Sequence, residues 1–469
     1  MGTNLWDVWE RAETGEICPV RKFEIDVYYK RLSELIKEYQ LEYNPENIVP
    51  TDNSLMDDVF NAALELVIDV GVLCLDTERI IKFEESEIKK MLKTAPKEAV
   101  FGQGKDSVTV KHRNLEDKSP PVVRCGPMAT PISEDIAIQI YQTYAMEPMT
   151  SILNFGTPLT LMGMKIRPNS PSELQAEVTN VISMRIATNR AGRPGMPITG
   201  SSAVSVAADI GSSLPEYGYR KGDNRCVWLL PQMKTDYAGL TRALHCMHYG
   251  FHIMSWGAGH IGGLCGGPEG AVVTSVAETL VASLLYKTTW NFVETLDIIH
   301  KGSSSRKAVW STCLANAAIN KNTQLITNAG SYAIYAGPCT DMCLYEIAVM
   351  TIGPTVVGAN ITGVAPYQGS HLDYCTGMEG SFLVEVAHAA TTLKREYAND
   401  IIKTIITKYE DRIKKREIPA GKKFQECFDV TSLTPSTEYT ELVRKIKKEL
   451  EDLGLEFGWR EEVVQRRNV

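Results

Sequence analysis

Short apolar segments alternate with longer amphipathic segments over most of this chain, and this alternation constrains the fold more than any other feature. A short apolar run followed by a helix-sized interval is typical of a strand and its crossover helix, so its repetition favours a parallel sheet. About eight such runs over roughly 250 residues favour an α/β fold closed into a (β/α)₈ TIM barrel over an open sheet. The predicted strands are residues 122–126, 151–156, 195–201, 226–231, 252–257, 297–302, 331–337 and 355–363.

The two ends of the chain have a different pattern from its middle. Residues 1–118 carry apolar side chains at helical spacing, and capping residues between Thr51 and Ser54, with Gly71, predict the two ends of one helix. A Ser-Pro-Pro break precedes the alternating region, and helical spacing returns after it. We therefore predict an N-terminal helical extension over residues 1–118, the barrel over 119–400, and a C-terminal helical extension over 401–469.

The helix that follows Pro168 has the clearest boundaries in the sequence. Ser170 is the expected N-cap, Pro171 fits the first helical position, and Glu173 would complete a capping box. Gly192 marks the end of this helix. The side chains expected on its buried face are Leu174, Val178, Val181, Ile182 and Ile186.

The charge balance of the sequence is acidic, with 57 acidic against 49 basic residues and a formal charge of −8. Nucleic acids and anionic membranes bind basic surfaces, so neither is an expected partner. No run reaches the roughly 18 apolar residues that span a bilayer, and we recognise no signal peptide. The 11 cysteines are widely scattered, which favours reduced thiols. We therefore expect a cytoplasmic protein.

The carboxyl ends of the strands carry the active site in such barrels, so residues at the predicted strand ends are the candidate site. These side chains are polar and aromatic and include no carboxylate, which favours binding and orienting a substrate over general acid–base catalysis. Their aromatic rings could bind a cation, or they could simply fill the barrel. The candidates are Asn154, Thr199, Trp228, Gln232, Trp256, His260, His300, Ser331, Tyr332, Tyr335 and Asn360.

Metal-ligand patterns in the sequence are weak. Cys339 and Cys343 are four residues apart and would need His371 or Cys375 to complete a soft-metal site. His245, His248 and His252 have the spacing of a helical two-histidine site but lack the accompanying glutamate. We interpret these residues as structural and predict no metal.

Eight segments of the sequence form a specific set of motifs: VPTD (49–52), GVLCLDTERI (71–80), GPMATPISED (126–135), AGRPGM (191–196), YAGPCTDMCL (335–344), TGME (376–379), PAGKKFQEC (419–427) and LEDLGL (450–455). Together they resemble one known family, the monomethylamine methyltransferases of methylotrophic methanogens. The resemblance extends over nearly the whole chain. It implies a (β/α)₈ barrel assembled as a homohexamer, which transfers a methyl group from an amine to the Co(I) corrinoid of a small partner protein. The corrinoid (cobalamin) belongs to that partner, so the resemblance implies no tightly bound cofactor in this chain.

The sequence departs from the family pattern at the substrate site. The family has pyrrolysine three residues after its Ala-Gly-Arg-Pro-Gly-Met segment, where this chain has Thr199. A family glutamate corresponds to Trp256, and a glutamine and a tyrosine correspond to Ser331 and Ala333, whereas Tyr332 is kept. In the family, the imine of pyrrolysine is thought to capture the amine. Threonine has no electrophilic carbon, so that adduct cannot form here.

These departures predict a pyrrolysine-independent methyltransferase whose donor is a quaternary ammonium or similar cation. A quaternary ammonium leaves as a neutral amine and needs no covalent activation, and an indole in place of a carboxylate suits such a cation. In the related trimethylamine methyltransferase superfamily, members without pyrrolysine act on quaternary amines such as glycine betaine. On this hypothesis Thr199, Trp256, Ser331 and Tyr332 form the catalytic pocket, and the other strand-end candidates bind substrate.

Two other interpretations are open at this point. The loss of several pocket residues together also fits a catalytically inactive paralogue that still docks a corrinoid protein. A barrel enzyme of another class, such as a lyase or hydrolase, is a third possibility, although the predicted strand ends lack carboxylates.

Overall fold

The computed structural model describes residues 5–200, 205–214 and 216–458, and its centre is a ring of eight parallel strands. Hydrogen bonding joins them in the order β12-β13-β15-β17-β19-β20-β6-β8, and a parallel bridge between Leu153 and Ile198 closes the ring. The predicted (β/α)₈ barrel is therefore confirmed. The strands are β6 (Val123–Cys125), β8 (Ile152–Leu153), β12 (Thr199–Gly200), β13 (Asn224–Cys226), β15 (His252–Gly257), β17 (Trp290–Val293), β19 (Thr327–Ser331) and β20 (Asn360–Gly363).

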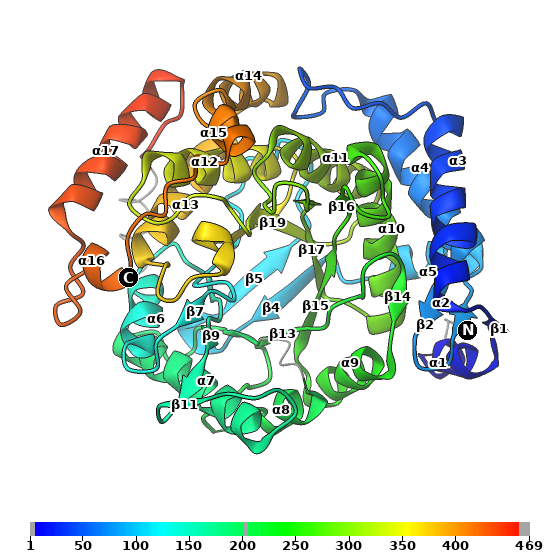
Figure 1. The fold of residues 1–469 in the computed structure, drawn as a ribbon, viewed down its shortest axis with the longest axis horizontal. Helices are drawn as coiled ribbons and strands as arrows, with labels where there is room; N and C mark the ends of the chain where they lie inside the picture. The colour runs from blue at the N-terminus through cyan, green and yellow to red at the C-terminus, as the bar shows by residue number, and fades with distance from the viewer. Residues whose placement is uncertain (1–4, 201–204, 215, 459–469) are drawn as a thin grey trace.

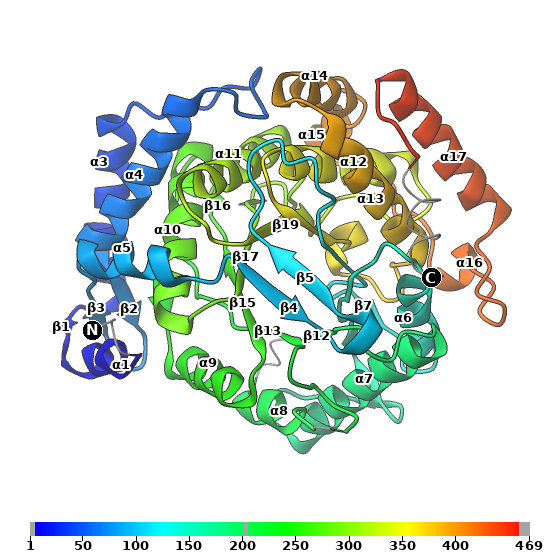
Figure 2. The same cartoon turned by 180° about the vertical axis from the view of Figure 1, so that it is seen from behind.

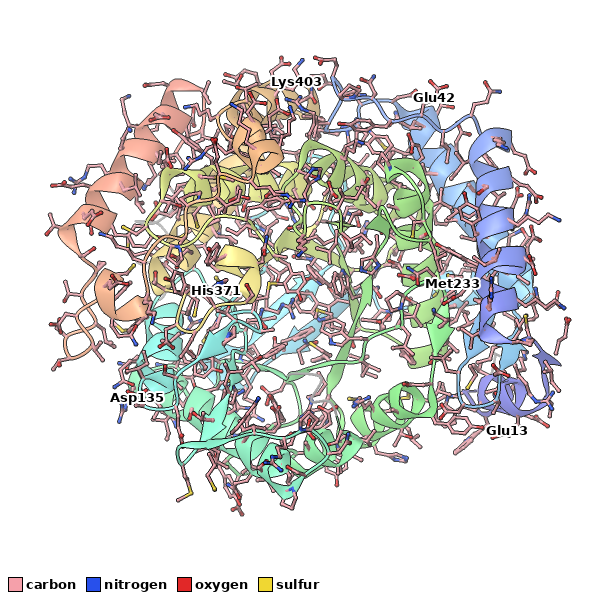
Figure 3. The ribbon with its side chains drawn as sticks, viewed as in Figure 1. Glu13, Glu42, Asp135, Met233, His371 and Lys403 are labelled. Carbon is pink, nitrogen blue, oxygen red and sulfur yellow. The ribbon has the colours of Figure 1, made fainter. Side chains whose placement is uncertain are left out.

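Each barrel strand is followed by a helix, and the helices surround the ring (Figure 1). In chain order they are α6 (Ala137–Ala145), α7 (Pro171–Arg190), α8 (Val206–Gly211), α9 (Tyr237–Tyr249), α10 (Pro268–Tyr286), α11 (Arg306–Asn322), α12 (Asp341–Val356) and α13 (Gly377–Ala389). Short strand pairs extend the loops at the carboxyl ends: β7 (Pro131–Ile132) with β9 (Thr157–Pro158), β10 (Thr160–Leu161) with β11 (Met164–Lys165), and β16 (His260–Ile261) with β18 (Leu296–Asp297). The side chains fill the space between these elements (Figure 3).

The predicted strand positions are correct for most of the ring and wrong at one place. The run 252–257 coincides with β15. The run 297–302 begins at the last residue of the short strand β18 and is otherwise a loop, and the true barrel strand is β17 at Trp290–Val293. The runs 226–231 and 331–337 each share only one residue with a strand. Ser201, at the end of another predicted run, lies outside the described residues. The errors arise because completely buried strands of two to five residues show no alternation, so neighbouring apolar loops look alike in the sequence.

The N-terminal extension combines helices with strands that sequence periodicity does not predict. Its β4–β5 hairpin lies across the amino end of the barrel (Figure 2), where Phe101 stacks on His252 at a ring-centroid distance of 3.8 Å. The helices are α1 (Leu5–Thr14), α2 (Val20–Lys22), α3 (Lys30–Glu38), α4 (Asn53–Val70) and α5 (Glu85–Thr94), with a π-helical segment at Phe23–Tyr29. The strands are β1 (Glu16–Ile17), β2 (Val72–Cys74), β3 (Arg79–Ile81), β4 (Glu98–Phe101) and β5 (Val108–Lys111). Since the hairpin covers the amino end, access to the barrel interior is from the carboxyl end.

Helix α4 and strand β2 join the N-terminal extension to the barrel. The ends of α4 agree with the prediction, because Asp52 caps its first turn through Ser54 N–H at 2.8 Å and Gly71 ends it with φ 71°. Helix α4 packs on α10, and strand β2 pairs with β14 (Lys234–Thr235) of the barrel. By length and composition α10 could cross a membrane, but 94% of its apolar window is buried inside the fold. The extension is thus part of the same packed body as the barrel.

The C-terminal extension is helical and covers one side of the barrel (Figure 1). Tyr439, on its last helix, donates a hydrogen bond of 2.5 Å to the buried carboxylate of Glu379 on α13. The helices are α14 (Arg395–Ile406), α15 (Glu410–Lys415), α16 (Phe424–Cys427) and α17 (Thr437–Asp452).

Helix α7 has the predicted ends, but its buried face is turned away from the predicted one. Ser170 caps it and Pro171 begins it, but the carboxylate of Glu173 accepts from Asn169 N–H and Ser205 N–H and makes no capping box. Of the predicted apolar face only Val181 is fully buried, and Leu174 is exposed. The face against the barrel instead carries polar side chains: Glu173, Glu177, Asn180, Arg185 and Thr188. Polar partners inside the fold make this burial possible, and periodicity of apolar residues cannot reveal it.

Candidate functional site

A cavity of about 850 Å³ lies at the carboxyl ends of the barrel strands. That volume is within the range of small-molecule sites, roughly 300–1,000 Å³. Its wall comes from the strand ends, from the loop between β8 and α7, and from the inner face of α7. The residues that matter below are Arg124, Asn154, Trp228, Trp256, His260, Glu278, Phe292 and Tyr332.

Aromatic rings from three strand ends form one wall of the cavity. The ring centroid of Trp256 lies 5.3 Å from that of Tyr332 and 6.2 Å from that of Trp228, both in edge-to-face geometry. The Trp256 indole N–H donates to the backbone oxygen of Glu294 at 3.0 Å, which fixes the ring plane. All three rings are half-buried. Such rings offer negative faces to a cation in the cavity.

A carboxyl group that the sequence prediction missed lies behind this wall. Glu294 directly follows β17, is fully buried, and accepts hydrogen bonds from Gly330 N–H at 3.0 Å and Tyr332 N–H at 3.1 Å. Burial raises its pKa to about 8. The expectation that no carboxylate stands at a strand end is therefore wrong, because β17 was placed seven residues too late, at 297 instead of 290. A glutamate directly after a short apolar run was the available signal.

Replacing Glu294 by glutamine should flatten the pH dependence of stability. The pKa of Glu294 is about 8 in the fold and 4.5 for an ordinary glutamate, so folding retains a proton that the unfolded chain releases in this interval. The free energy of unfolding therefore falls as the pH rises from about 4.5 to about 8. Glu294→Gln has no proton to lose, so its slope should be shallower. Urea unfolding of both proteins between pH 4.5 and 8 measures this slope. Parallel plots of the free energy of unfolding against pH for wild type and Glu294→Gln would contradict the prediction.

An arginine forms part of the cavity wall deep in the barrel. Arg124 on β6 is 1% exposed, and its Nε donates to the Thr362 hydroxyl at 2.7 Å. Its guanidinium carbon lies 5.7 Å from the ring centroid of Phe292 and 5.8 Å from that of Trp290. Burial lowers the pKa of Arg124, and Cys226 and Glu294 act in the opposite direction. A charged residue inside an otherwise apolar strand was the sequence signal for this residue.

Glu278 of α10 also reaches the cavity wall. Its carboxyl oxygens accept from Met233 N–H at 3.3 Å (Met233 is labelled in Figure 3) and from Ala258 N–H at 2.9 Å. Burial raises the pKa of Glu278 to about 8. The group ties two loops of the barrel mouth to α10, so its contacts are those of a structural residue.

Comparison with known proteins now places the chain in a family. The family model described as "Monomethylamine methyltransferase MtmB" matches residues 3–455. The monomethylamine methyltransferase MtmB2 of Methanosarcina barkeri is 33% identical over 456 residues, which are 97% of this chain and 98% of the relative. The chain belongs to the monomethylamine methyltransferase family.

Solved structures agree with this assignment. The crystal structure of the monomethylamine methyltransferase of Methanosarcina barkeri superposes with a TM-score of 0.93 at 32% identity, covering 97% of this chain and 98% of that one. The structure of a hydroxylamine complex of MtmB gives the same TM-score. Another relative, MtmB of Methanosarcina mazei, is 32% identical over 97% of this chain and 98% of its own. As a member of this family the chain is a methyltransferase, and 97% of its length is covered by the family's solved structure.

The structure of this methyltransferase brings five of the predicted site residues into the cavity wall. They are Asn154, Trp228, Trp256, His260 and Tyr332. Burial lowers the pKa of His260, so its imidazole is neutral at pH 7. Thr199 on β12 and Ser331 on β19 are completely buried, and neither hydroxyl has a hydrogen-bond partner among the described residues. Neither of these two residues is part of the cavity wall.

The other predicted residues are not among those that line the cavity. Asn360 is at the amino end of β20, where its amide bonds to Lys111 O, Thr327 O and Val122 N–H, so its assignment to a carboxyl end is wrong. His300 is in an exposed loop and pairs with Asp297 at 2.9 Å. Tyr335 is buried against Gly302. Gln232 is half-buried in the loop after β13, with φ 59°.

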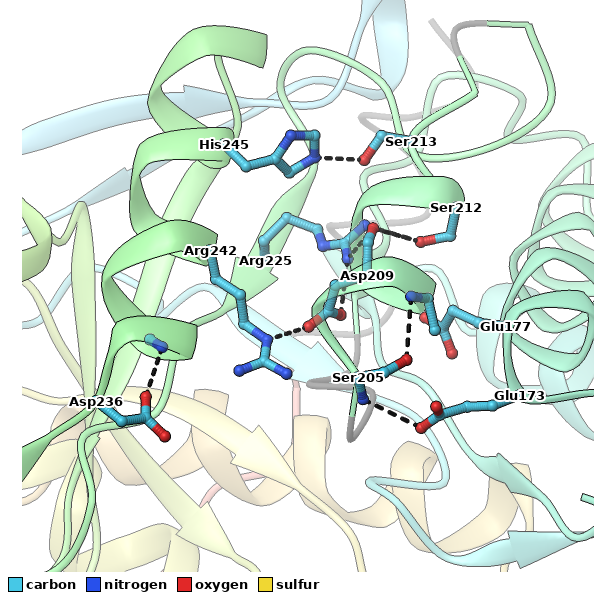
Figure 4. A network of polar contacts seen from close by, with 12 residues as sticks. Glu173, Glu177, Ser205, Asp209, Ser212, Ser213, Arg225, Asp236, Arg242 and His245 are labelled. Atoms are coloured by element: carbon cyan, nitrogen blue, oxygen red, sulfur yellow. Dashed lines mark hydrogen bonds and ion pairs between the residues drawn. The ribbon is translucent and has the colours of Figure 1, made fainter. Parts of the chain in front are cut away.

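The histidines and cysteines considered as metal ligands have other surroundings. Among residues 5–200, 205–214 and 216–458, no group of three or more His, Cys, Asp or Glu side chains could hold a metal ion. His245 contacts the Ser213 hydroxyl at 2.9 Å (Figure 4), and His252 contacts Val100 O at 2.8 Å. Cys343 is buried, and Cys339 is half-buried.

Proposed function

We propose that this chain transfers a methyl group from a quaternary ammonium cation to the Co(I) corrinoid of a partner protein, without pyrrolysine. The observation that carries this proposal is the aromatic wall of Trp228, Trp256 and Tyr332 in a cavity at the carboxyl end of the barrel. Family membership supports the coarser statement, methyl transfer from a methylated amine to a corrinoid protein. The aromatic character of the wall supports the finer statement, that the methyl donor is a quaternary ammonium.

The chemistry of the leaving group links the wall to the donor. Attack of Co(I) on a methyl carbon breaks the C–N bond, and the bonding pair leaves with nitrogen. From a quaternary ammonium this gives a neutral tertiary amine and needs no proton, whereas a neutral amine would leave as an amide anion. The enzyme then has to hold the cation and aim one methyl group at the acceptor, so orientation supplies most of the rate.

The residues take different parts in this mechanism. The three rings bind the ammonium head, and we assign Trp256 and Tyr332 to the pocket itself. Thr199, which by resemblance stands at the pyrrolysine position, has a hydroxyl and no electrophile, so no covalent enzyme–substrate adduct forms. Ser331, at the end of β19, belongs with Thr199 to the catalytic pocket predicted from the sequence. The corrinoid is a substrate delivered by the partner, and no residue of this chain ligates it in the proposal.

A cobalt assay tests the function directly. The protein is mixed with a reduced Co(I) corrinoid protein or free cobalamin, and the visible spectrum is followed with each donor in turn. Tetramethylammonium, choline and glycine betaine should give enzyme-dependent methyl-Co(III), and monomethylamine should not. Turnover of monomethylamine alone would overturn the proposal. If no donor gives methyl-Co(III) while a corrinoid protein still binds, the result would instead favour an inactive paralogue that docks the corrinoid protein.

The resemblance also leads us to propose a homohexamer located in the cytoplasm. Native mass spectrometry of the purified protein tests the assembly.

A further inference from the structure

We propose that the cavity has a second subsite, for the carboxylate of a zwitterionic donor, formed by the guanidinium of Arg124 and the side-chain amide of Asn154. This inference rests on the proposed function and adds to it. It names the substrate class: a quaternary ammonium that carries an anionic group, of the betaine type, in preference to a simple cation.

The first observation is the missing counter-charge of Arg124. Its Nε has a hydroxyl partner, but no carboxylate among the described residues lies within ion-pair distance, and no oxygen among them accepts from its terminal nitrogens. The neighbouring Cys226 thiol hydrogen-bonds Arg124, and the Glu294 carboxyl acts on it from further away. Neither supplies a full charge at pH 7, because burial raises the pKa of the thiol to about 12 and that of the carboxyl to about 8. An arginine that is 1% exposed and has no charged partner at ion-pair distance carries a large desolvation cost. A carboxylate from a ligand would remove that cost.

The second observation is a donor without a partner on the adjacent strand. Asn154 follows β8, which pairs with β6, and its backbone N–H donates to Cys125 O at 2.9 Å. Its Oδ1 accepts from Phe155 N–H at 3.1 Å, which fixes the orientation of the amide. Its Nδ2 is then a donor, is buried, and has no partner among the described residues. Both donors therefore come from neighbouring strands and line the same cavity.

Phe292 connects this pair to the aromatic wall. Its ring centroid lies 5.7 Å from the Arg124 guanidinium carbon, 5.7 Å from the ring of Trp256 and 6.2 Å from the ring of Tyr332. A simple cation bound at the wall would be repelled by Arg124 nearby. A short zwitterion avoids that repulsion, because its carboxylate pairs with Arg124 while its ammonium head faces the rings. The aromatic wall and Arg124 together therefore select a ligand that carries both an ammonium head and a carboxylate.

Binding measurements without cobalt test the subsite separately from the reaction. The probes are glycine betaine, choline, 3,3-dimethylbutanoate and 3,3-dimethylbutanol, which combine a charged or neutral head with a charged or neutral tail. By isothermal titration calorimetry, wild type should bind glycine betaine at least about tenfold more tightly than choline, as expected for hydrogen bonds to a charged group. Arg124→Gln should remove this preference, and Arg124→Lys should retain part of it.

Two further variants control for folding and for the amide. Asn154→Asp keeps an acceptor for Phe155 N–H but replaces the donor. It should therefore weaken the binding of glycine betaine and leave the binding of choline unchanged or tighter. Arg113→Lys makes the same substitution as Arg124→Lys, but at a buried arginine whose donors bond to Thr355 O and Ala359 O and which does not line the cavity. The preference for glycine betaine over choline should therefore remain in this variant.

The outcomes separate this inference from the proposed function. Equal binding of glycine betaine and choline by wild type, or a preference that survives Arg124→Gln, would overturn the subsite and leave a cation donor intact. Arg124-dependent binding of 3,3-dimethylbutanoate, with no gain from the ammonium head, would support the subsite and overturn the cation wall. Failure of all probes to bind would overturn the subsite.

Discussion

Replacing Trp256 by leucine should weaken the binding of quaternary ammonium donors by about 30-fold and slow methyl transfer from them at least as much. A desolvated cation–π contact contributes about 2 kcal/mol, and 1.4 kcal/mol corresponds to a factor of ten in affinity. Trp256 contacts Tyr332, Phe292 and Trp228, so it is the central ring of the wall. Trp256→Phe keeps a smaller aromatic face and should recover part of the loss.

Neutral ligands and a distant tryptophan supply the controls for this result. The affinity of 3,3-dimethylbutanol should change by less than about threefold in Trp256→Leu, because leucine still offers apolar contact without a ring face. Trp6→Leu alters an exposed ring on α1, which is 62% exposed and remote from the barrel mouth, and should change nothing. Equal losses for choline and for its neutral analogue would mean that Trp256 only fills space.

The architecture followed from the sequence because its signals act over many residues. Alternation repeated around a ring, caps such as Asp52 and Ser170, and glycine at the end of α4 all agree in the structure. The caps and the glycine fix the ends of single helices, and the repeated alternation fixes the barrel. A single misplaced strand, β17, does not change the inference of a barrel when the other runs are consistent.

The site was less predictable, for physical reasons that particular residues show. The strand-end rule found Trp228, Trp256 and Tyr332, because all three lie within two residues of the carboxyl end of a barrel strand, where the cavity is. It missed Glu294 because a short buried strand has no period that would locate its end. It missed Arg124 because it selects residues at the ends of strands, and Arg124 is in the middle of β6. The spacing of apolar residues gave the wrong buried face for α7, because that helix buries Glu173, Glu177 and other polar side chains.

Replacing Asp209 by alanine should destabilise the fold by about 3–5 kcal/mol, the range for breaking a buried ion pair from one side. The Asp209 carboxylate on α8 pairs with Arg225 at 3.0 Å and also with Arg242 (Figure 4). The side chain of Arg225 is only 3% exposed and stacks on Tyr219, with 4.0 Å from its guanidinium carbon to the ring centroid. Removing the carboxylate leaves two arginine charges with little access to water.

The matched control is an aspartate of the same type in an exposed pair. Asp411 pairs with Lys414 at 3.2 Å, but its side chain is 71% exposed, so Asp411→Ala should cost about 0–1 kcal/mol. Urea unfolding of both variants gives the comparison. Because α8 begins shortly after β12, which carries Thr199, Asp209→Ala should also weaken donor binding under conditions where the variant is still folded. A cost as small as that of Asp411→Ala would mean that water reaches Arg225 and Arg242, and that the network does not hold this part of the site in place.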